Sequence, residues 1–167
     1  MKILVTGGAG FIGSHTVVEL LNAGFEPVII DNFSNSNRSA LAGLRQILNH
    51  DVPFYEADCN DAEALNAIFE KENFRGVIHF AAHKAVGESV AKPLMYYRNN
   101  LDSTLLLLET MQRYGVPNLV FSSSCTVYGQ PEHLPVTEET PRLPAQSPYG
   151  NTKAICEDII RDTVRAD

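Results

Sequence analysis

Short apolar segments alternate along the chain with longer segments whose apolar residues recur every three or four positions. The first kind is typical of buried strands and the second of amphipathic helices. Lys2–Thr6 (KILVT) has the strand pattern, whereas Leu41, Leu44 and Leu48 share one face of a helix. The pattern predicts strands at Lys2–Thr6, Val28–Asp31, Val52–Ala57, Gly76–Ala81 and Asn118–Ser122, and helices at Ser14–Ala23, Ala40–Asn49, after Asp61, at Leu94–Tyr114 and from Pro148 to Asp167.

Turn and capping residues support these boundaries. Gly24 suits the end of the first helix, because glycine readily adopts the left-handed conformation that often follows a helix. Asp61 is a suitable N-cap for the helix whose apolar stripe contains Leu65, Ile68 and Phe69. The proline-rich stretch 130–147 predicts a loop before the last helix.

Strands that alternate with helices of ten or more residues indicate βαβ units and a parallel sheet. Because the strands are almost continuously apolar, we expect helices to cover both faces of the sheet. No internal linker divides the chain. The fold class predicted is therefore α/β, a doubly wound parallel sheet in one domain that spans residues 1–167.

Composition excludes several classes of protein. Hydrophobic residues make up 44% and charged residues 20%, as in ordinary soluble globular proteins. The net charge of −7 disfavours nucleic acid as a partner, and no apolar run reaches the ~18 residues of a membrane span. The start of the chain lacks a signal-peptide pattern, and the three cysteines form no pair typical of a zinc site or disulfide framework. We expect a cytoplasmic protein with no membrane partner and no metal.

A glycine-rich turn follows the first strand and opens the first helix. Its sequence TGGAGFIG contains Gly8-x-Gly10-x-x-Gly13 and also Gly7-x-x-Gly10-x-x-Gly13. Glycines there permit a tight turn and a close approach of a pyrophosphate, which the helix N-terminus then binds. Asp31 lies 18 residues after Gly13, where an acidic residue binds the ribose 2′-hydroxyl and repels a 2′-phosphate. The turn predicts a Rossmann dinucleotide-binding fold, with sheet order 3-2-1-4-5, and NAD as cofactor.

Polar or unusual residues lie at the carboxyl end of every predicted strand, where ligands bind in open α/β sheets, and we expect one crevice to collect them. We expect Asp58 to bind the adenine amine, and Phe80 and Ala81 to line the path of the ribose and nicotinamide. After the glycine-rich turn that ends the first strand, the residues at the other strand ends are Asp31-Asn32, Asp58, Phe80-Ala81-Ala82-His83-Lys84 and Ser122-Ser123-Ser124.

Tyr149 and Lys153 are four residues apart at the start of the last predicted helix, so their side chains share a face. A free tyrosine is a poor base at neutral pH, but a nearby ammonium favours the phenolate. Ser124 could hydrogen-bond the same substrate oxygen. A hydroxyl, a phenol and an ammonium beside a nicotinamide suit redox chemistry between an alcohol and a ketone.

Two other features carry less weight. His79 and His83 have the spacing of a helical metal site but straddle the end of a strand, which argues against zinc. Cys125 has no paired base in the sequence, so we expect it to be a spectator rather than a nucleophile.

Taken together, these residues resemble the extended short-chain dehydrogenase/reductase family, and within it the epimerases that act on UDP-hexoses. The resemblance is carried by TGGAGFIGSH (6–15), DNFSNS (31–36), HFAAHKAVGESV (79–90), SSSCTVYG (122–129) and SPYGNTK (147–153). Related sugar-nucleotide dehydratases typically carry Thr-Asp-Glu where this chain has Ser124-Cys125-Thr126. The acid and base for loss of water are thus absent, which argues against dehydration.

The resemblance implies NAD-dependent epimerisation at carbon 4 of a UDP-sugar, interconverting UDP-glucose and UDP-galactose through a transient 4-keto sugar in galactose metabolism. Tyr149 would be the base, Lys153 would bind the nicotinamide ribose and tune Tyr149, and Ser124 would steady the sugar oxygen. Lys84, Ser124 and Tyr149 would contact the substrate. The residues expected to hold NAD are Gly7, Gly10, Phe11, Ile12, Gly13, Asp31, Asn32, Phe33, Ser34, Asn35, Ser36, Asp58, Cys59, Phe80, Ala81, Ala82, Lys84, Asn99, Ser122, Tyr149 and Lys153.

Members of this family are roughly twice as long, in keeping with a second, substrate-binding domain. The resemblance therefore indicates an incomplete Rossmann domain, truncated before the last strands and the C-terminal substrate domain, and inactive alone. It also implies a homodimer through the helices around Leu94–Tyr114 and Pro148–Asp167. Two alternatives stay open: another nucleotide-sugar epimerase or reductase of the family, and a non-catalytic NAD-binding module.

Overall fold

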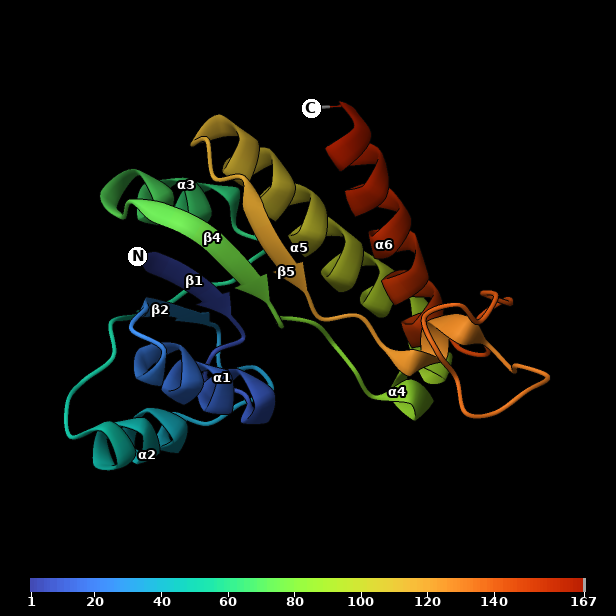
Figure 1. Ribbon diagram of the computed structural model, residues 1–167, viewed down its shortest axis with the longest axis horizontal. Helices are drawn as coiled ribbons and strands as arrows, with labels where there is room; N and C mark the ends of the chain where they lie inside the picture. Colours follow the sequence, from blue (N-terminus) through green and yellow to red (C-terminus); the bar gives the residue numbers. More distant parts are fainter. Residues whose placement is uncertain (167) are drawn as a thin grey trace. The chain divides into compact units, whose positions relative to one another are not determined.

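The computed structural model describes residues 1–166 of the chain (Figure 1). These residues divide into two compact units. The first unit consists of Met1–Ala81 and Leu106–Ser122, and the second of Ala82–Leu105 and the residues from Ser123 onward. The long helix α5 (Pro93–Arg113) contributes its first part to the second unit and its last part to the first.

Five parallel strands form the sheet of the first unit. They are β1 (Lys2–Thr6), β2 (Glu26–Asp31), β3 (Phe54–Glu56), β4 (Phe74–His79) and β5 (Asn118–Phe121), in the order β3-β2-β1-β4-β5. This confirms the predicted fold class and strand order. Thr6 pairs with Ile30 on one side and with His79 on the other, and His79 pairs with Phe121. The carboxyl ends of β2, β1, β4 and β5 therefore lie level with one another at the same end of the sheet.

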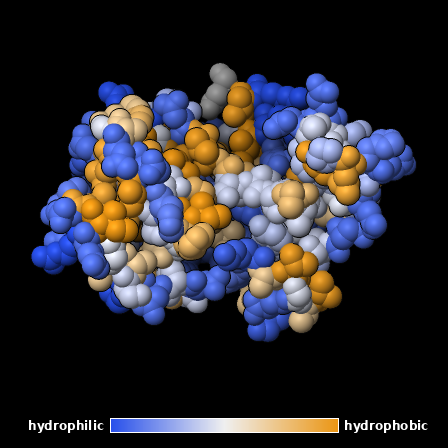
Figure 2. Space-filling view, turned by 60° about the horizontal axis from the view of Figure 1, so that its bottom comes forward, coloured by the Kyte–Doolittle hydropathy of each residue, from blue (hydrophilic) through white to orange (hydrophobic). Residues whose placement is uncertain are grey.

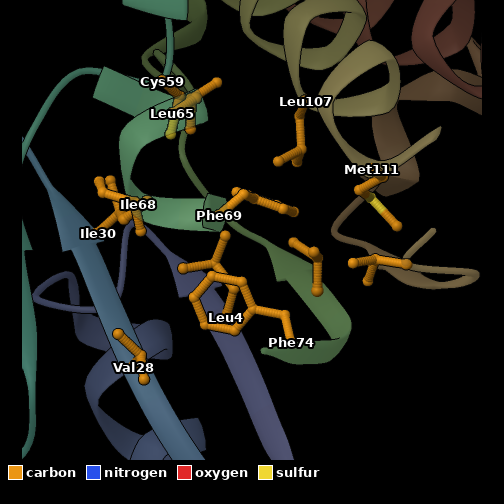
Figure 3. Packing of buried hydrophobic residues seen from close by; sticks show 12 residues of the cluster. Leu4, Val28, Ile30, Cys59, Leu65, Ile68, Phe69, Phe74, Leu107 and Met111 are labelled. Atoms are coloured by element: carbon orange, nitrogen blue, oxygen red, sulfur yellow. The ribbon is translucent and has the colours of Figure 1, made fainter. Parts of the chain in front are cut away.

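Helices cover both faces of this sheet, as the apolar strands predicted (Figure 1). Helices α1 (Phe11–Asn22) and α2 (Ser39–Leu48) pack on the face that carries Ile3 and Val5. Helix α3 (Ala62–Lys71) and the last part of α5 pack on the face that carries Leu4. Figure 3 shows Leu107 and Met111 of α5 extending toward this second cluster, which also contains Phe69 and Phe74. Alternating side chains of β1 thus contribute to two separate cores.

The predicted caps are present. The side chain of Asp61 accepts hydrogen bonds from the backbone N–H groups of Glu63 and Ala64, at 3.0 Å each, and so begins α3. Gly24 follows α1 with φ +81°, and Gly115 follows α5 with φ +63°; both values are strained for any residue with a Cβ atom.

The second unit contains α4 (Val86–Ala91), the first part of α5, a short 3₁₀ helix η1 (Cys125–Tyr128) and α6 (Pro148–Ala166). Gly150 of α6 packs so closely on Thr126 of η1 that an added Cβ atom would lie 3.1 Å from the threonine side chain. The predicted loop 130–147 joins these two helices without regular secondary structure of its own.

Several predicted boundaries differ from the structure. The fourth strand ends at His79 rather than Ala81, and the third is limited to Phe54–Glu56. The first helix begins at Phe11 rather than Ser14, because Gly10 serves as its N-cap. Neither α4 nor η1 was predicted, since six and four residues are too short to show helical periodicity. The predicted end of the last helix, Asp167, lies outside the described residues.

Within residues 1–166, no helix is both long enough and apolar enough to cross a membrane. On the face shown in Figure 2, hydrophobic residues reach the surface in patches separated by hydrophilic ones. At the edge of the sheet, Val120 of β5 is 60% exposed.

Candidate nucleotide-binding and catalytic sites

The glycine-rich turn lies at the carboxyl end of β1, in the first unit. Gly7 has φ +68°, and a Cβ atom added there would lie 2.9 Å from the backbone nitrogen of Ala81. A Cβ atom at Gly13 would overlap the carbonyl oxygen of Gly7. Gly7 is therefore required for the conformation of the turn and for its close packing on the segment after β4, and Gly13 is required for the close packing of α1 on the turn.

The N-terminus of α1 opens from this turn. Phe11 and Ile12, the first two residues of the helix, are 77% and 57% exposed. The first N–H groups of a helix lack partners within the helix, and its dipole favours an anion near them. The turn thus has the conformation and the exposed helix end that a pyrophosphate requires.

Asp31 ties this turn to the loop that follows β2. Its carboxylate is nearly buried, and it accepts hydrogen bonds from the backbone N–H of Ala9 at 3.0 Å, the backbone N–H of Phe33 at 2.9 Å and the hydroxyl of Ser36 at 2.7 Å. The predicted ribose-binding residue is therefore also the residue that organises the adjoining loop.

A second pair of side chains extends this arrangement to β3. Asn32 donates a hydrogen bond to Asp58 at 2.8 Å, so residues after β2 and after β3 lie together as predicted. Phe33 has φ +55°, which is strained for an aromatic residue, and the guanidinium of Arg38 lies 4.9 Å from the centre of its ring. Ser34 and Asn35 are exposed in the same loop.

The end of β4 completes the candidate site of the first unit. The hydroxyl of Thr6 and Nδ1 of His79 are hydrogen-bonded at 2.6 Å, and the His79 ring is buried and stacks 6.0 Å from that of Phe121. His79 therefore has a structural role. Beyond it, Phe80 packs against the sheet core and Ala81 donates its N–H to the Thr6 hydroxyl at 3.3 Å. Ser122 follows β5, where its N–H donates to the His79 carbonyl.

One residue expected to hold NAD is in the hydrophobic core. Cys59 is buried beside Leu65, and burial raises the pKa of its thiol to about 12 (Figure 3). The sequence pattern could not show that this side chain is buried, and a contact of Cys59 with NAD stays a prediction.

The predicted catalytic residues all lie in the second unit. Tyr149 is the second residue of α6 and is half-buried, and Lys153 lies one turn further along the same face with only 4% exposed. Burial lowers the pKa of the Lys153 ammonium to about 8, an effect that Cys156 partly opposes. Ser147 caps the helix, because its hydroxyl accepts the N–H of Gly150 at 3.1 Å.

Ser124 is the N-cap of η1, where its hydroxyl oxygen accepts hydrogen bonds from the N–H of Thr126 at 3.3 Å and from the Thr126 hydroxyl at 2.9 Å. Because Gly150 packs on Thr126, η1 and the start of α6 are in direct contact. Ser124, Tyr149 and Lys153 are therefore carried by two adjoining helices, although they lie up to 29 residues apart in the sequence.

Asn100 of α5 is a buried residue that the sequence analysis missed. Its side chain amide donates to the carbonyl of His83 and to the hydroxyl of Thr152, both at 3.0 Å, and accepts the N–H of His83 at 2.8 Å. Thr152 in turn donates to the carbonyl of Tyr149 at 2.7 Å. Asn100 thus links the segment that contains Lys84 to the helix that carries Tyr149. The signal that could have identified it was a group of polar residues, Asn100, Ser103 and Thr104, on the same face of the helix as the apolar residues Tyr96 and Leu107.

The second unit also contains other residues that the sequence places at the candidate site. Asn99, half-buried beside Asn100, donates a hydrogen bond to its side chain at 3.0 Å. Ala82 is half-buried and Lys84 is exposed. Ser123 donates its hydroxyl to Glu157, whose other carboxylate oxygen accepts from Arg142 at 3.0 Å, so the serine-rich segment is anchored to α6 and to the loop before it.

Cys125 is exposed, and within residues 1–166 no three His, Cys, Asp or Glu side chains are grouped as metal ligands would be.

The order of the parallel strands and the glycine-rich first turn define a Rossmann-like α/β protein. Residues 4–167 match the family model described as GDP-mannose 4,6 dehydratase, and the chain belongs to this family.

The relatives that match the chain are named UDP-glucose 4-epimerase. The chain is 57% identical over its whole length to the enzyme from Bacillus subtilis, and it covers 49% of that protein. It is 53% identical over 99% of its length to the human enzyme, of which it also covers 49%. The structure matches UDP-glucose 4-epimerase from Bifidobacterium longum, solved with NAD⁺ and UDP, with a TM-score of 0.98 at 50% identity, covering all of this chain and 50% of that one.

The UDP-Glc/GlcNAc 4-epimerase from Campylobacter jejuni matches with a TM-score of 0.93 at 39% identity, over 99% of this chain and 50% of that one. The chain therefore spans about half the length of the relatives it matches.

Proposed function

We propose that this chain is the cofactor-binding and catalytic portion of an NAD-dependent epimerase that inverts carbon 4 of a UDP-hexose, interconverting UDP-glucose and UDP-galactose. The observation that carries the proposal is the set Ser124, Tyr149 and Lys153 on two adjoining helices, in a chain about half identical to UDP-glucose 4-epimerases.

The residues of the first unit fit NAD. Gly7 and Gly13 admit no side chain, the N-terminus of α1 is exposed beside them, and Asp31 supplies a carboxylate at the end of β2. These residues would hold the pyrophosphate and the adenosine ribose, and the Asp31 carboxylate would repel a 2′-phosphate. When bound, NAD supplies the reversible removal of a hydride from carbon 4.

The residues of the second unit would then manage the proton. Tyr149, as the phenolate, takes the proton of the 4-hydroxyl while the C4–H bond breaks, and it returns that proton when the 4-keto sugar is reduced on its other face. The ammonium of Lys153, one helical turn away, stabilises the phenolate. The Ser124 hydroxyl would donate to the sugar oxygen.

Dehydration is disfavoured in spite of the name of the family model. Cys125 and Thr126 stand where the related dehydratases carry Asp and Glu, so no carboxyl group is present there to donate or accept the protons of water loss.

Replacing the proposed base tests this function. In the full-length protein, Tyr149→Phe should lower the turnover of UDP-galactose by at least about 100-fold, because a general base contributes that much or more. The NAD content, measured on the denatured protein, should stay unchanged. Tyr114→Phe is the matched control, since Tyr114 packs on Phe69 in the core of the first unit. A Tyr149→Phe variant with normal turnover would exclude Tyr149 as the base.

The purified chain of 167 residues gives a second test, because we propose that it does not epimerise by itself. Turnover of UDP-galactose by this chain would contradict that part of the proposal. Assays with UDP-galactose and its N-acetylated counterpart distinguish an epimerase of the kind named for Campylobacter jejuni from one limited to UDP-glucose. A protein that retains NAD but transforms no nucleotide sugar would be the non-catalytic module. The homodimer through α5 and α6 stays a prediction.

A further inference from the structure

The two residues that flank Lys84 are fixed by side chains of α5. His83 is held on one side, because the Asn100 side chain accepts its N–H at 2.8 Å and donates to its carbonyl at 3.0 Å. Ala85 is held on the other side, because its N–H donates to the hydroxyl of Tyr96 at 3.0 Å. Lys84 itself is exposed. The backbone is thus fixed immediately before and after a lysine whose side chain faces solvent.

Tyr96 is held in place by burial and by a charged partner. The residue is fully buried, and the His83 ring packs 5.4 Å from its own ring. Its hydroxyl donates to Oε2 of Glu88 at 3.0 Å, and Oε1 of Glu88 accepts from the Lys92 ammonium at 3.2 Å. The phenol proton is therefore directed at the Glu88 carboxylate, and the phenol oxygen accepts the N–H of Ala85.

At neutral pH Tyr96 stays protonated and Glu88 stays ionised. Burial and the Glu88 carboxylate raise the pKa of Tyr96, and the hydrogen bonds from Tyr96 and Lys92 lower the pKa of Glu88. Tyr96 is therefore a constant donor to Glu88 and a constant acceptor for Ala85.

We propose that Tyr96, together with Glu88, is a positioning residue that fixes the backbone of Lys84 so that its ammonium meets the diphosphate of the nucleotide sugar. This inference rests on the proposed function. A lysine is a flexible point charge that loses side-chain entropy when it binds phosphate. Fixing its backbone beforehand reduces the ordering that binding requires. Tyr96 acts on binding through Lys84 and not on the proton transfer at Tyr149.

The test measures UDP binding by calorimetry in the full-length protein, with turnover measured separately. Tyr96→Phe keeps the buried ring and removes the hydroxyl, and it should weaken UDP binding and raise the KM for UDP-galactose by about tenfold. The kcat should change by less than about twofold. Glu88→Gln, which retains an oxygen to accept the Tyr96 proton, should bind UDP nearly as well as the wild type. Tyr114→Phe is the control for loss of a tyrosine hydroxyl outside this cluster.

A double-mutant cycle separates positioning from general support of the fold. If Tyr96 acts through Lys84, then Tyr96→Phe should weaken UDP binding in the wild type but have no further effect in a Lys84→Met background. An equal loss in both backgrounds, or unchanged UDP binding in Tyr96→Phe, would overturn the proposal. If Tyr96→Phe does not fold, as judged by near-ultraviolet circular dichroism, the same cycle with Glu88→Ala decides, because Glu88 is exposed. Wild-type protein that binds UDP but does not epimerise would refute the proposed function alone.

Discussion

The first unit is held together by apolar packing, whereas the second is held largely by polar contacts. Among the described residues of the second unit, the buried hydrophobic ones are Tyr96, Val127 and Cys156, whereas its buried polar ones are Ser89, Asn100, Ser103, Thr104, Ser147, Thr152 and Lys153. The first unit has the reverse balance, with two hydrophobic clusters on the two faces of one sheet. The unit that carries the glycine-rich turn is thus built on apolar packing, and the unit that carries the expected catalytic residues is a hydrogen-bonded assembly.

This difference has an energetic meaning. Burial of apolar area is non-directional and tolerates small shifts, whereas a buried hydrogen bond loses its value when its geometry changes. A catalytic unit built on hydrogen bonds fixes the orientation of its side chains at the expense of stability. We therefore expect core mutations to have their largest effects in the first unit, and polar mutations to have local effects in the second.

The largest loss should come from the core of the first unit. Phe69 is buried, with ring centres 5.1 Å from Phe74 and 5.8 Å from Tyr114. Phe69→Ala should lower the free energy of unfolding by about 3–5 kcal/mol, because it leaves a cavity as well as removing apolar contacts. Urea denaturation of the chain measures this. Phe54→Ala, at an exposed position on β3, should cost less than about 1.5 kcal/mol; equal costs would refute the contrast in burial.

An intermediate change in the free energy of unfolding, an increase rather than a decrease, should come from replacing Lys153. Its ammonium has a pKa of about 8 in the folded chain and an ordinary value of 10.5. Below pH 8 the lysine is protonated in both the folded and the unfolded chain, so the folded chain bears the full cost of burying the charge. As the pH rises from 8 to 10.5, the folded chain loses the proton first, and that cost disappears. Lys153→Met should therefore stabilise the unbound chain at pH 7, by up to roughly 3 kcal/mol.

Urea denaturation at several pH values checks this prediction. The difference in unfolding free energy between Lys153→Met and the wild type should shrink between pH 8 and 10.5. A difference that stays constant over this range would mean that burial of the charge is not the cause.

The smallest effect should come from the hydrogen-bonded centre of the second unit. Asn100→Leu removes the partner of the His83 backbone and of the Thr152 hydroxyl, and should cost about 1–3 kcal/mol. Hydrogen exchange should become faster at the His83 amide but not in β1 or β2. Asn22→Leu, at an exposed position in the last turn of α1, should change stability by less than about 0.5 kcal/mol. Faster exchange across the sheet would show that the two units do not respond separately.

The same difference explains what the sequence could predict. In β1 and the glycine-rich turn, the apolar pattern, the glycine spacing and the start of the helix all indicate the same strand–turn–helix unit within a few adjacent residues. The strand Lys2–Thr6 and the sheet order were therefore predicted correctly. The Asp61 cap and the Gly24 turn are also local features and were predicted correctly.

The contacts of the second unit join distant residues, and no local pattern reveals them. Tyr96 meets Ala85 and Glu88, and Asn100 meets Thr152 across 52 positions. Spacing could single out Tyr149 and Lys153 as candidates because both lie on one helix, but it could not identify Asn100, which holds that helix through Thr152. Within the first unit, it likewise could not show that the Cys59 side chain faces the core.

The three hydrogen bonds of Asp31 have a consequence for redesign. To make the protein accept a 2′-phosphorylated cofactor, an engineer would remove this carboxylate. That change also releases the Ala9 amide in the glycine-rich turn, the Phe33 amide and the Ser36 hydroxyl. If Asp31 sets the cofactor preference as we propose, one carboxylate determines both that preference and the shape of the loop, and a switch of preference would have to rebuild the segment 31–36 rather than exchange one residue.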